Sequence, residues 1–179
     1  MDNRYPFYQE TRIIKYMNKN RAFTLIELLI VVGLIAILAG VVFVALDPFT
    51  RFRDARNARR AADVASIASA IRVHQVDNGG NYIASVAGLT NATSYMIVTN
   101  TGNSCIVDAL CSGTSNNCAD LSGLSNGGYL GAIPISPKGA AAAAWGSGKT
   151  GYYIRKNSNN SITVGACESE GAAAIEVTR

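Results

Sequence analysis

The longest apolar stretch of the sequence is FTLIELLIVVGLIAILAGVVFVAL, residues 23–46, which holds only two polar side chains, Thr24 and Glu27. About 20 apolar residues in a helix cross the roughly 30 Å hydrocarbon core of a membrane. The apolar part of a cleaved secretory signal is shorter, roughly 7–15 residues. Residues 23–46 therefore predict a transmembrane helix. Glu27 is its exception, because a carboxylate inside a membrane is costly and by default functional.

Residues 47–78 follow the span as an amphipathic continuation. Apolar side chains recur there at the three- and four-residue spacing of a helix, at Ala61, Val64, Ala65, Ile67, Ala68 and Ile71. Asn78 and two glycines end the pattern, as glycine does just past a helix C-terminus. Pro48 removes a helical hydrogen bond. We therefore expect one long helix from about Thr24 to Asp77, bent at Pro48, whose apolar stripe needs a partner surface.

Residues 79–179 change in composition and predict a small β head. The segment is rich in Gly, Ser, Asn and Thr, and residues 100–128 resemble loops. Apolar residues alternate with other residues at 162–166 and 175–177, and residues 151–155 form a third short strand-like run. Consecutive short strands favour an antiparallel sheet. The expected fold class is α+β: a long N-terminal α-helix, transmembrane in its first half, packed on a small antiparallel sheet.

The positive charge of the chain lies mostly before the span. Of the net charge of +4, residues 1–22 contribute +3, from five basic and two acidic side chains. The pI near 9.0 is therefore no argument for nucleic-acid binding. Five arginines follow the span, at positions 51, 53, 56, 59 and 60. They suit anionic lipid headgroups or DNA, but we favour a solvated helix in which they pair with Asp47, Asp54 and Asp63.

All four cysteines lie beyond the span, at Cys105, Cys111, Cys118 and Cys167. They form no CxxC pair, and the single histidine, His74, is distant in sequence, so a zinc site is not expected. Disulfides in an oxidising compartment are the better interpretation. Four cysteines allow three connectivities, which sequence does not resolve. Close spacing favours Cys111–Cys118 with Cys105–Cys167.

A basic leader ends in Arg21-Ala22 and continues into Phe23-Thr24-Leu25-Ile26-Glu27 at the start of the span. This junction resembles the prepilin signal of type IV pilins and of the pseudopilins of type II secretion systems. The resemblance implies that a prepilin peptidase cuts between Ala22 and Phe23, removes the leader of residues 1–22, and methylates the new amine of Phe23. Ala22 stands where the family most often has Gly, and a start at Met17 would shorten the leader.

The resemblance also implies a function and a location. The mature chain would be a structural subunit that polymerises through its N-terminal helix, with Glu27 of one copy meeting the terminal amine of the next. The implied partners are other copies of the chain, the prepilin peptidase, an inner-membrane assembly platform and the lipid bilayer. The implied location is the cytoplasmic membrane, with a single pass, a cytoplasmic N-terminus and an extracytoplasmic head, and then a surface pilus or pseudopilus. The alternative is a minor pilin or membrane-anchored binding module for DNA or surface adhesion.

No motif in the sequence predicts an enzyme, a cofactor or a metal. The segment Gly146-Ser147-Gly148-Lys149-Thr150 invites a P-loop interpretation, but Ala143 stands where that motif needs its first glycine. His74 has no nearby nucleophile or acid in sequence, and we expect it to be an exposed helix residue. Asp108 and Asp120 lack the spacing of a calcium loop.

Overall fold

The computed structural model describes residues 23–99, 105, 108–111, 114–139, 144–171 and 173–179. The chain divides into two compact units, one ending at Leu46 and one beginning at Asp47. The expected leader, residues 1–22, lies outside the described residues.

The first unit is the helix α1, Leu25–Leu46. It begins where the Thr24 hydroxyl accepts a hydrogen bond from the Glu27 amide at 3.2 Å, the role of an N-cap threonine. Its 22 residues correspond to about 33 Å at 1.5 Å per residue, and none of them is buried. By length and composition, the helix that begins at Leu25 is the one described helix able to cross a membrane.

The second unit begins with α2, Pro48–Asp77. The expected bend at Pro48 is an interruption one residue earlier, because Asp47 adopts a left-handed conformation with φ of 36°. The Asp47 carboxylate caps α2 by accepting bonds from the amide and hydroxyl of Thr50 at 3.4 and 2.6 Å. Pro48 then occupies the first helical position, where its missing N–H costs nothing. The chain reverses after Asn78 through Gly79 and Gly80, both with positive φ.

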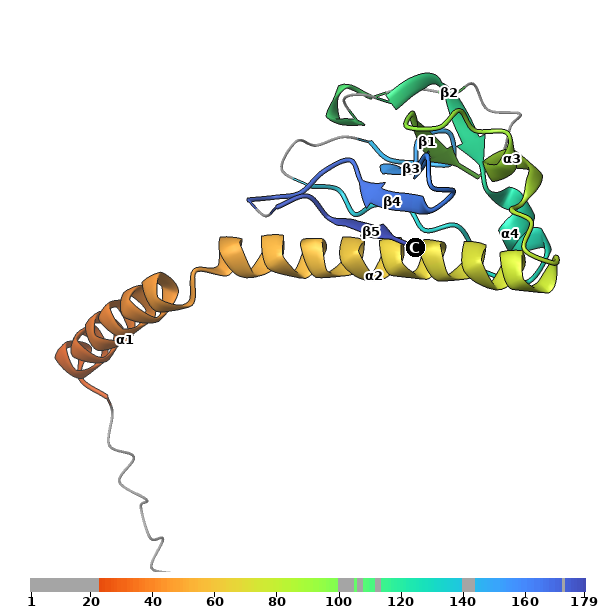
Figure 1. Ribbon diagram of the computed structural model, residues 1–179. Coiled ribbons are helices and arrows are strands. Elements are labelled where there is room, and N and C mark those ends of the chain that lie inside the picture. Colours follow the sequence, from red (N-terminus) through yellow and green to blue (C-terminus); the bar gives the residue numbers. More distant parts are fainter. Residues whose placement is uncertain (1–22, 100–104, 106–107, 112–113, 140–143, 172) are drawn as a thin grey trace, which may run out of the picture. The chain divides into compact units, whose positions relative to one another are not determined.

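The head contains one five-stranded sheet in the order β2-β1-β3-β4-β5 (Figure 1). Its strands are β1 Ser94–Val98, β2 Thr114–Asp120, β3 Tyr152–Lys156, β4 Ile162–Ala166 and β5 Glu176–Thr178. Short helical turns lie at α3 Ala84–Ala87, η1 Ala109–Cys111 and α4 Ser122–Asn126. Strands β1, β3, β4 and β5 pair antiparallel, and β2 pairs parallel to β1.

The three strands expected in the last third are confirmed as β3, β4 and β5. The expectation that residues 100–128 are loops is wrong, because β2, η1 and α4 lie there. Strand β1 was also missed. Its sequence, SYMIV, is buried at four of five positions and therefore shows no period-2 alternation. Strand β2, TSNNCAD, is too polar to be distinguished from a loop.

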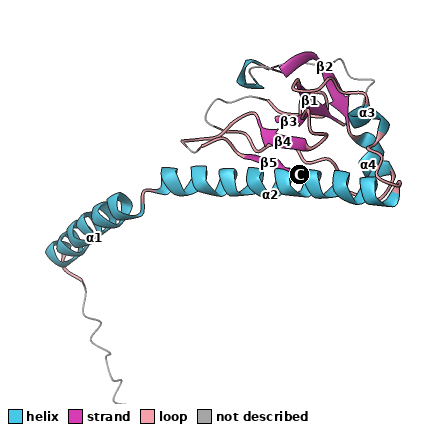
Figure 2. Ribbon diagram, in the orientation of Figure 1, coloured by secondary structure: helices cyan, strands magenta, loops and turns pink. Residues whose placement is uncertain are grey.

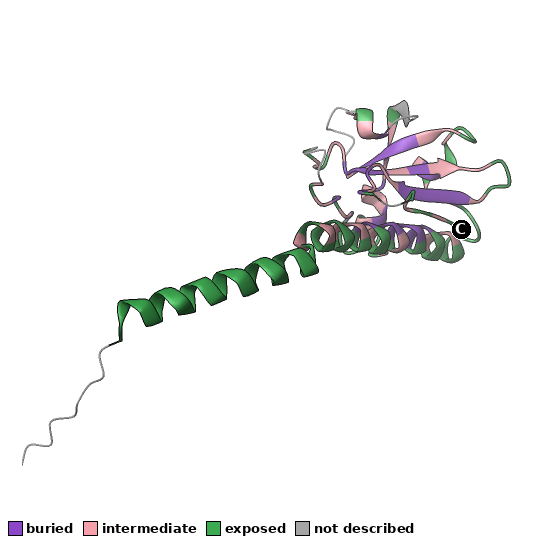
Figure 3. Ribbon diagram, turned by 90° about the vertical axis from the view of Figure 1, so that its left-hand side faces the viewer, coloured by how far each residue is buried: buried purple, intermediate pink, exposed green. Residues whose placement is uncertain are grey.

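The helix α2 lies along one face of the sheet (Figure 2). Its buried apolar residues, Val64, Ile67, Ala68, Ala70 and Ile71, join a core with residues of β1, β3 and β4. Figure 3 shows this burial confined to one side of the helix. The expected stripe is confirmed at four of its six positions, whereas Ala61 is exposed and Ala65 is half-buried. The remaining buried residue of α2 is an arginine, Arg60.

Candidate functional site

The N-terminal segment presents the residues of the expected signal on one exposed helix end. Phe23 is 78% exposed and precedes α1. Thr24 and Glu27 stand three residues apart, the spacing of a capping box, and the Glu27 carboxylate lies in the first turn, where the helix dipole favours a negative charge. Ala22, on the other side of the expected cleavage bond, lies outside the described residues.

One face of α1 carries a shallow apolar hollow of about 280 Å³ with Glu27 near its N-terminal end. The hollow is lined by Phe23, Glu27, Leu28, Val31, Val32 and Ile35. Apart from the single carboxylate, this face offers only hydrocarbon. It suits the side chains of another apolar helix or lipid acyl chains.

The arginine cluster that follows the span divides between two environments. Arg51, Arg53 and Arg59 are exposed, and Arg59 lies 3.9 Å from Asp63 one turn ahead. Arg56 and Arg60 instead turn toward the head. The expectation of a wholly solvated cluster is therefore wrong for these two residues, because acids from the far end of the chain, rather than acids on the helix, neutralise them.

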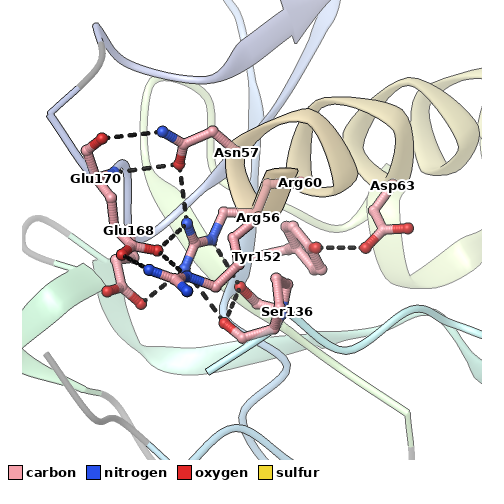
Figure 4. A network of polar contacts seen from close by, with 9 residues as sticks. Arg56, Asn57, Arg60, Asp63, Ser136, Tyr152, Glu168 and Glu170 are labelled. Carbon is pink, nitrogen blue, oxygen red and sulfur yellow. Dashed lines mark hydrogen bonds and ion pairs between the residues drawn. The ribbon is translucent and has the colours of Figure 1, made fainter. Parts of the chain in front are cut away.

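Arg60 is fully buried, and every N–H of its guanidinium has an acceptor (Figure 4). Its Nε donates to the Ser136 hydroxyl at 3.2 Å. Its two terminal nitrogens donate to a carboxylate oxygen of Glu170 at 2.9 Å and of Glu168 at 3.1 Å, and also to the Asn57 side chain and the Pro137 carbonyl. A buried arginine has five donors to satisfy, and this site satisfies all five.

Glu170 is also hydrogen-bonded by a second arginine, Arg56, and through its backbone by Asn57. Arg56 donates to both of its carboxylate oxygens, one through Nε at 2.7 Å. Asn57 donates to the Glu170 carbonyl at 3.0 Å and accepts from the Glu170 amide at 3.2 Å. The hydrogen bond from Arg56, assisted by Arg60, lowers the pKa of Glu170 to about 2 against the effect of its burial. The carboxylate is therefore held as an anion over the whole physiological range.

Two further contacts surround Arg60. The Glu168 carboxylate lies against the backbone of Gly139 and leaves no room for a Cβ there, so this close approach requires glycine. The Tyr152 hydroxyl of β3 donates to Asp63 of α2 at 2.6 Å. Burial, with this bond to Asp63, raises the pKa of Tyr152 far above its usual range, so that it remains a donor. We call the set Arg56, Asn57, Arg60, Asp63, Ser136, Tyr152, Glu168 and Glu170 the Arg60 cluster.

The disulfides of the head are Cys105–Cys118 and Cys111–Cys167. The pairing that close spacing favoured, Cys111–Cys118 with Cys105–Cys167, is therefore wrong. The physical reason is the parallel pairing of β1 and β2, which sets Cys118 opposite Met96, while Cys111 and Cys167 lie over Met96 with their Sγ atoms 3.7 and 4.0 Å from its Sδ. Met96, Val98 and Cys111 form a second small core, with Cys118, Trp145 and Cys167 packed against it.

The Cys111–Cys167 bridge adjoins the Arg60 cluster. Glu168 follows Cys167 directly, and Glu170 comes two residues later. A surface hollow of about 430 Å³ lies beside this segment and is lined by Arg53, Leu110 and residues 167–171. Its carboxylates are those already bonded to Arg56 and Arg60. The carboxylates of this hollow are therefore already paired, and the other charged side chain that lines it is the exposed Arg53.

The other residues considered from the sequence lie outside the Arg60 cluster, and two of them, Lys149 and Asp108, contact each other. Lys149 pairs with Asp108 at 3.0 Å and lies 5.9 Å from the centroid of the Trp145 ring. The segment 146–150 forms a tight turn that leads into β3 rather than into a helix, so it lacks the geometry of a P-loop. His74, expected to be exposed, is half-buried, with its ring against Tyr129 at 5.0 Å.

Asp120, the other acid considered for calcium, accepts a hydrogen bond from the Ser122 amide at 2.8 Å. Among the residues that the structure describes, no three His, Cys, Asp or Glu side chains are grouped so as to hold a metal ion.

The Arg60 cluster was not predicted from the sequence, although the sequence contains one signal for it. Arg60, Val64, Ile67 and Ile71 recur at four-, three- and four-residue steps, so the arginine continues the buried stripe. An arginine within a buried stripe predicts a buried anion. The sequence does not indicate which anion this is, because Glu168 lies 108 residues from Arg60.

Comparisons with known proteins bear on the N-terminal segment. Residues 17–43 match a family model described as the prokaryotic N-terminal methylation motif. The chain therefore carries the prepilin signal of type IV pilins and pseudopilins over these residues. A search of curated proteins and a search of solved structures gave no significant match.

Proposed function

We propose that this chain is a prepilin, a precursor of a structural subunit of a type IV pilus or a pseudopilus. The leader of residues 1–22 is removed between Ala22 and Phe23 by a prepilin peptidase, and the amine of Phe23 is methylated. The match to the methylation motif at residues 17–43 supports this processing. Before assembly, α1 holds the subunit in the cytoplasmic membrane in a single pass, with the head in the extracytoplasmic compartment.

The observation that carries the proposal is the complete exposure of α1 in a chain with this motif. All 22 of its residues are exposed, and all but Glu27 are apolar or glycine. Removing a Leu, Ile or Val side chain from water is favourable by about 1.5–3 kcal/mol. A helix with so many exposed apolar side chains is therefore stable only in an apolar environment. Lipid provides that environment in the membrane, and the α1 helices of other copies provide it in a fibre.

Glu27 gives the fibre its register in this proposal. The carboxylate of one copy meets the cationic amine of Phe23 of the next. Within an apolar helix core, an unpaired charge is strongly unfavourable, so copies that pair these groups are favoured over copies that slip along the helix axis. The hollow on α1, with Glu27 near its N-terminal end, supports a helix as the neighbour.

The head gives the fibre its outer surface. The sheet and the C-terminal segment are held against α2 by the ion pairs of the Arg60 cluster and by apolar contacts with the buried stripe of α2. The cysteines of the head pair as disulfides, which form and persist in oxidising compartments. This supports an extracytoplasmic position for the head.

Mass spectrometry of the mature N-terminus tests the proposal. We expect a chain that begins at Phe23 and carries one additional methyl group on its amine. A chain purified from its own cells that retains residues 1–22 would contradict the proposal. A minor pilin or a membrane-anchored binding module for DNA or adhesion would share this processing. Quantifying the chain in purified fibres distinguishes these alternatives, because a major subunit is the predominant protein there.

A further inference from the structure

The two disulfides of the head interleave along the chain. The structure joins the first cysteine to the third, Cys105–Cys118, and the second to the fourth, Cys111–Cys167. Each bridge therefore encloses one cysteine of the other. A chain that oxidises its cysteines as consecutive pairs, in the order in which they emerge from the membrane, instead forms Cys105–Cys111 and Cys118–Cys167.

Loop closure also favours incorrect pairs in the unfolded chain. The native partners of Cys111–Cys167 are 56 residues apart, whereas Cys111 and Cys118 are seven residues apart. The probability of closing a flexible loop falls as about the 3/2 power of its length, so the seven-residue loop closes about 20-fold more readily than the 56-residue loop. In the unfolded chain, Cys111 therefore forms a disulfide with a cysteine close in sequence sooner than with Cys167.

The folded head favours the native pairs once they are reached. Met96 is fully buried against both cysteines of the Cys111–Cys167 bridge, and Cys118 of the other bridge packs beside it. The native bond at Cys167 also holds the segment that places Glu168 and Glu170 on the buried Arg60. A chain in which Cys111 is bonded to Cys105 or Cys118 lacks that restraint on the two carboxylates. The native pairing is thus the stable one and the slower one to form.

We propose that this head is a substrate of a thiol–disulfide isomerase, a protein whose reactive thiolate reshuffles disulfides without net oxidation. The isomerase thiolate attacks Cys105 of the Cys105–Cys111 bond, forms a mixed disulfide and releases the Cys111 thiolate. Cys111 attacks Cys167 of the Cys118–Cys167 bond, which forms Cys111–Cys167 and releases Cys118. Cys118 attacks Cys105 in the mixed disulfide, which forms Cys105–Cys118 and regenerates the isomerase thiolate.

Refolding of the full-length chain in detergent tests the proposal. The reduced, denatured chain is oxidised rapidly, returned to native conditions and divided between buffer alone and a catalytic amount of a reduced bacterial disulfide isomerase. Bridges are then mapped by mass spectrometry after proteolysis. We expect mostly non-native bridges at the start and at least tenfold faster appearance of Cys105–Cys118 and Cys111–Cys167 with the isomerase. An isomerase whose reactive cysteines are replaced by serine should give no acceleration.

Two double variants serve as matched controls. Cys105→Ser with Cys118→Ser leaves Cys111 and Cys167, and Cys111→Ser with Cys167→Ser leaves Cys105 and Cys118. Each variant can form only one intramolecular bridge, so neither should depend on the isomerase. The proposal is overturned if the full chain regains its native bridges equally fast in buffer alone, if the controls depend on the isomerase equally, or if the mapped native bridges are different ones.

This test does not depend on the prepilin proposal, which supplies only the oxidising compartment in which the reaction takes place. The refolding result is read from the bridges, whereas processing is read from the Phe23 terminus. Failure of one therefore leaves the other standing.

Discussion

At the scale of single residues, Arg60 is a fully buried cation whose five donors are all hydrogen-bonded. Removing a guanidinium from water costs several kcal/mol, and two carboxylates and three neutral acceptors offset that cost here. The pairs are a weak source of net stability, since an apolar substitute of similar shape is often as good. Their consequence is specificity: the head is well packed only when Glu168 and Glu170 lie on this face of α2.

Arg60→Ala should therefore lower the free energy of unfolding of the head by about 3–5 kcal/mol, because it leaves two buried carboxylates without their shared partner. Chemical denaturation of the full-length chain in detergent, followed by Trp145 fluorescence, measures the loss. Arg59→Ala is the matched control. The Arg59 side chain is 67% exposed, so its loss should cost less than about 1 kcal/mol. Equal losses in the two variants would falsify the role given to Arg60.

Because of the lowered pKa of Glu170, we expect the head to lose stability in acid. Its pKa is about 2 in the folded chain, against an ordinary value of 4.5. A depressed folded pKa contributes stability above the unfolded value, and that stability is lost as the pH falls from about 4.5 to about 2. The loss amounts to at most about 3.5 kcal/mol, since one pKa unit corresponds to about 1.4 kcal/mol.

Denaturation of Glu170→Gln across this pH range tests the assignment. The difference in unfolding free energy between the original chain and the variant should narrow as the pH falls from 5 toward 2. Glu176→Gln, at an exposed position of β5, should leave the pH dependence of the original chain in place. A difference for Glu170→Gln that stays constant over this interval would show that Glu170 is not the titrating group.

At the scale of elements, the N-terminal end of α1 is stabilised in two ways, by a capping side chain and by a negative charge. Thr24 caps the helix, and Glu27 supplies a charge that is favourable at a helix N-terminus. A change in Glu27 therefore acts on assembly through its charge or through fraying of the helix end. The two mechanisms are separable because only one of them requires the carboxylate.

Glu27→Ala should leave the head folded and strongly reduce incorporation of the chain into fibres, because an unpaired Phe23 amine would remain in the apolar core. Thr24→Ala is the control. It removes a helix cap worth about 1 kcal/mol and keeps the carboxylate. Fibres sheared from cells are quantified for each variant. Normal fibre yield for Glu27→Ala, or an equal defect in Thr24→Ala, would contradict the charge-pairing mechanism.

At the scale of the whole molecule, the two disulfides should contribute unequally to stability. The Cys111–Cys167 loop spans 56 residues and the Cys105–Cys118 loop spans 13. Chain entropy alone makes the longer bridge about 1 kcal/mol more stabilising. Loss of the longer bridge also removes a covalent restraint on the segment that carries Glu168 and Glu170.

Comparing the two double serine variants by chemical denaturation measures this inequality. Cys111→Ser with Cys167→Ser should be the less stable variant by at least about 1 kcal/mol. A head that loses equal stability in both variants would show that the Arg60 cluster does not depend on its adjoining bridge.

The sequence alone predicted the elements whose signals are local. The apolar run 23–46, the buried stripe of α2 and the strands β3 to β5 follow from composition and period, and the structure contains all of them. It did not predict β1 and β2. The first is too uniformly apolar to show alternation, and the second is a polar edge strand paired parallel to its neighbour.

The sequence by itself determined the N-terminal segment of this protein. An apolar helix with one carboxylate, preceded by a basic leader, carries its whole pattern within residues 17–43, because a membrane selects for a continuous run of hydrocarbon. Only the tertiary structure decided the partners of Arg60 and the pairing of the cysteines. Apart from the bond between Arg60 and Asn57, those contacts join residues between 13 and 110 positions apart. Their identity depends on how β1, β2 and the C-terminal segment meet, which no local pattern records.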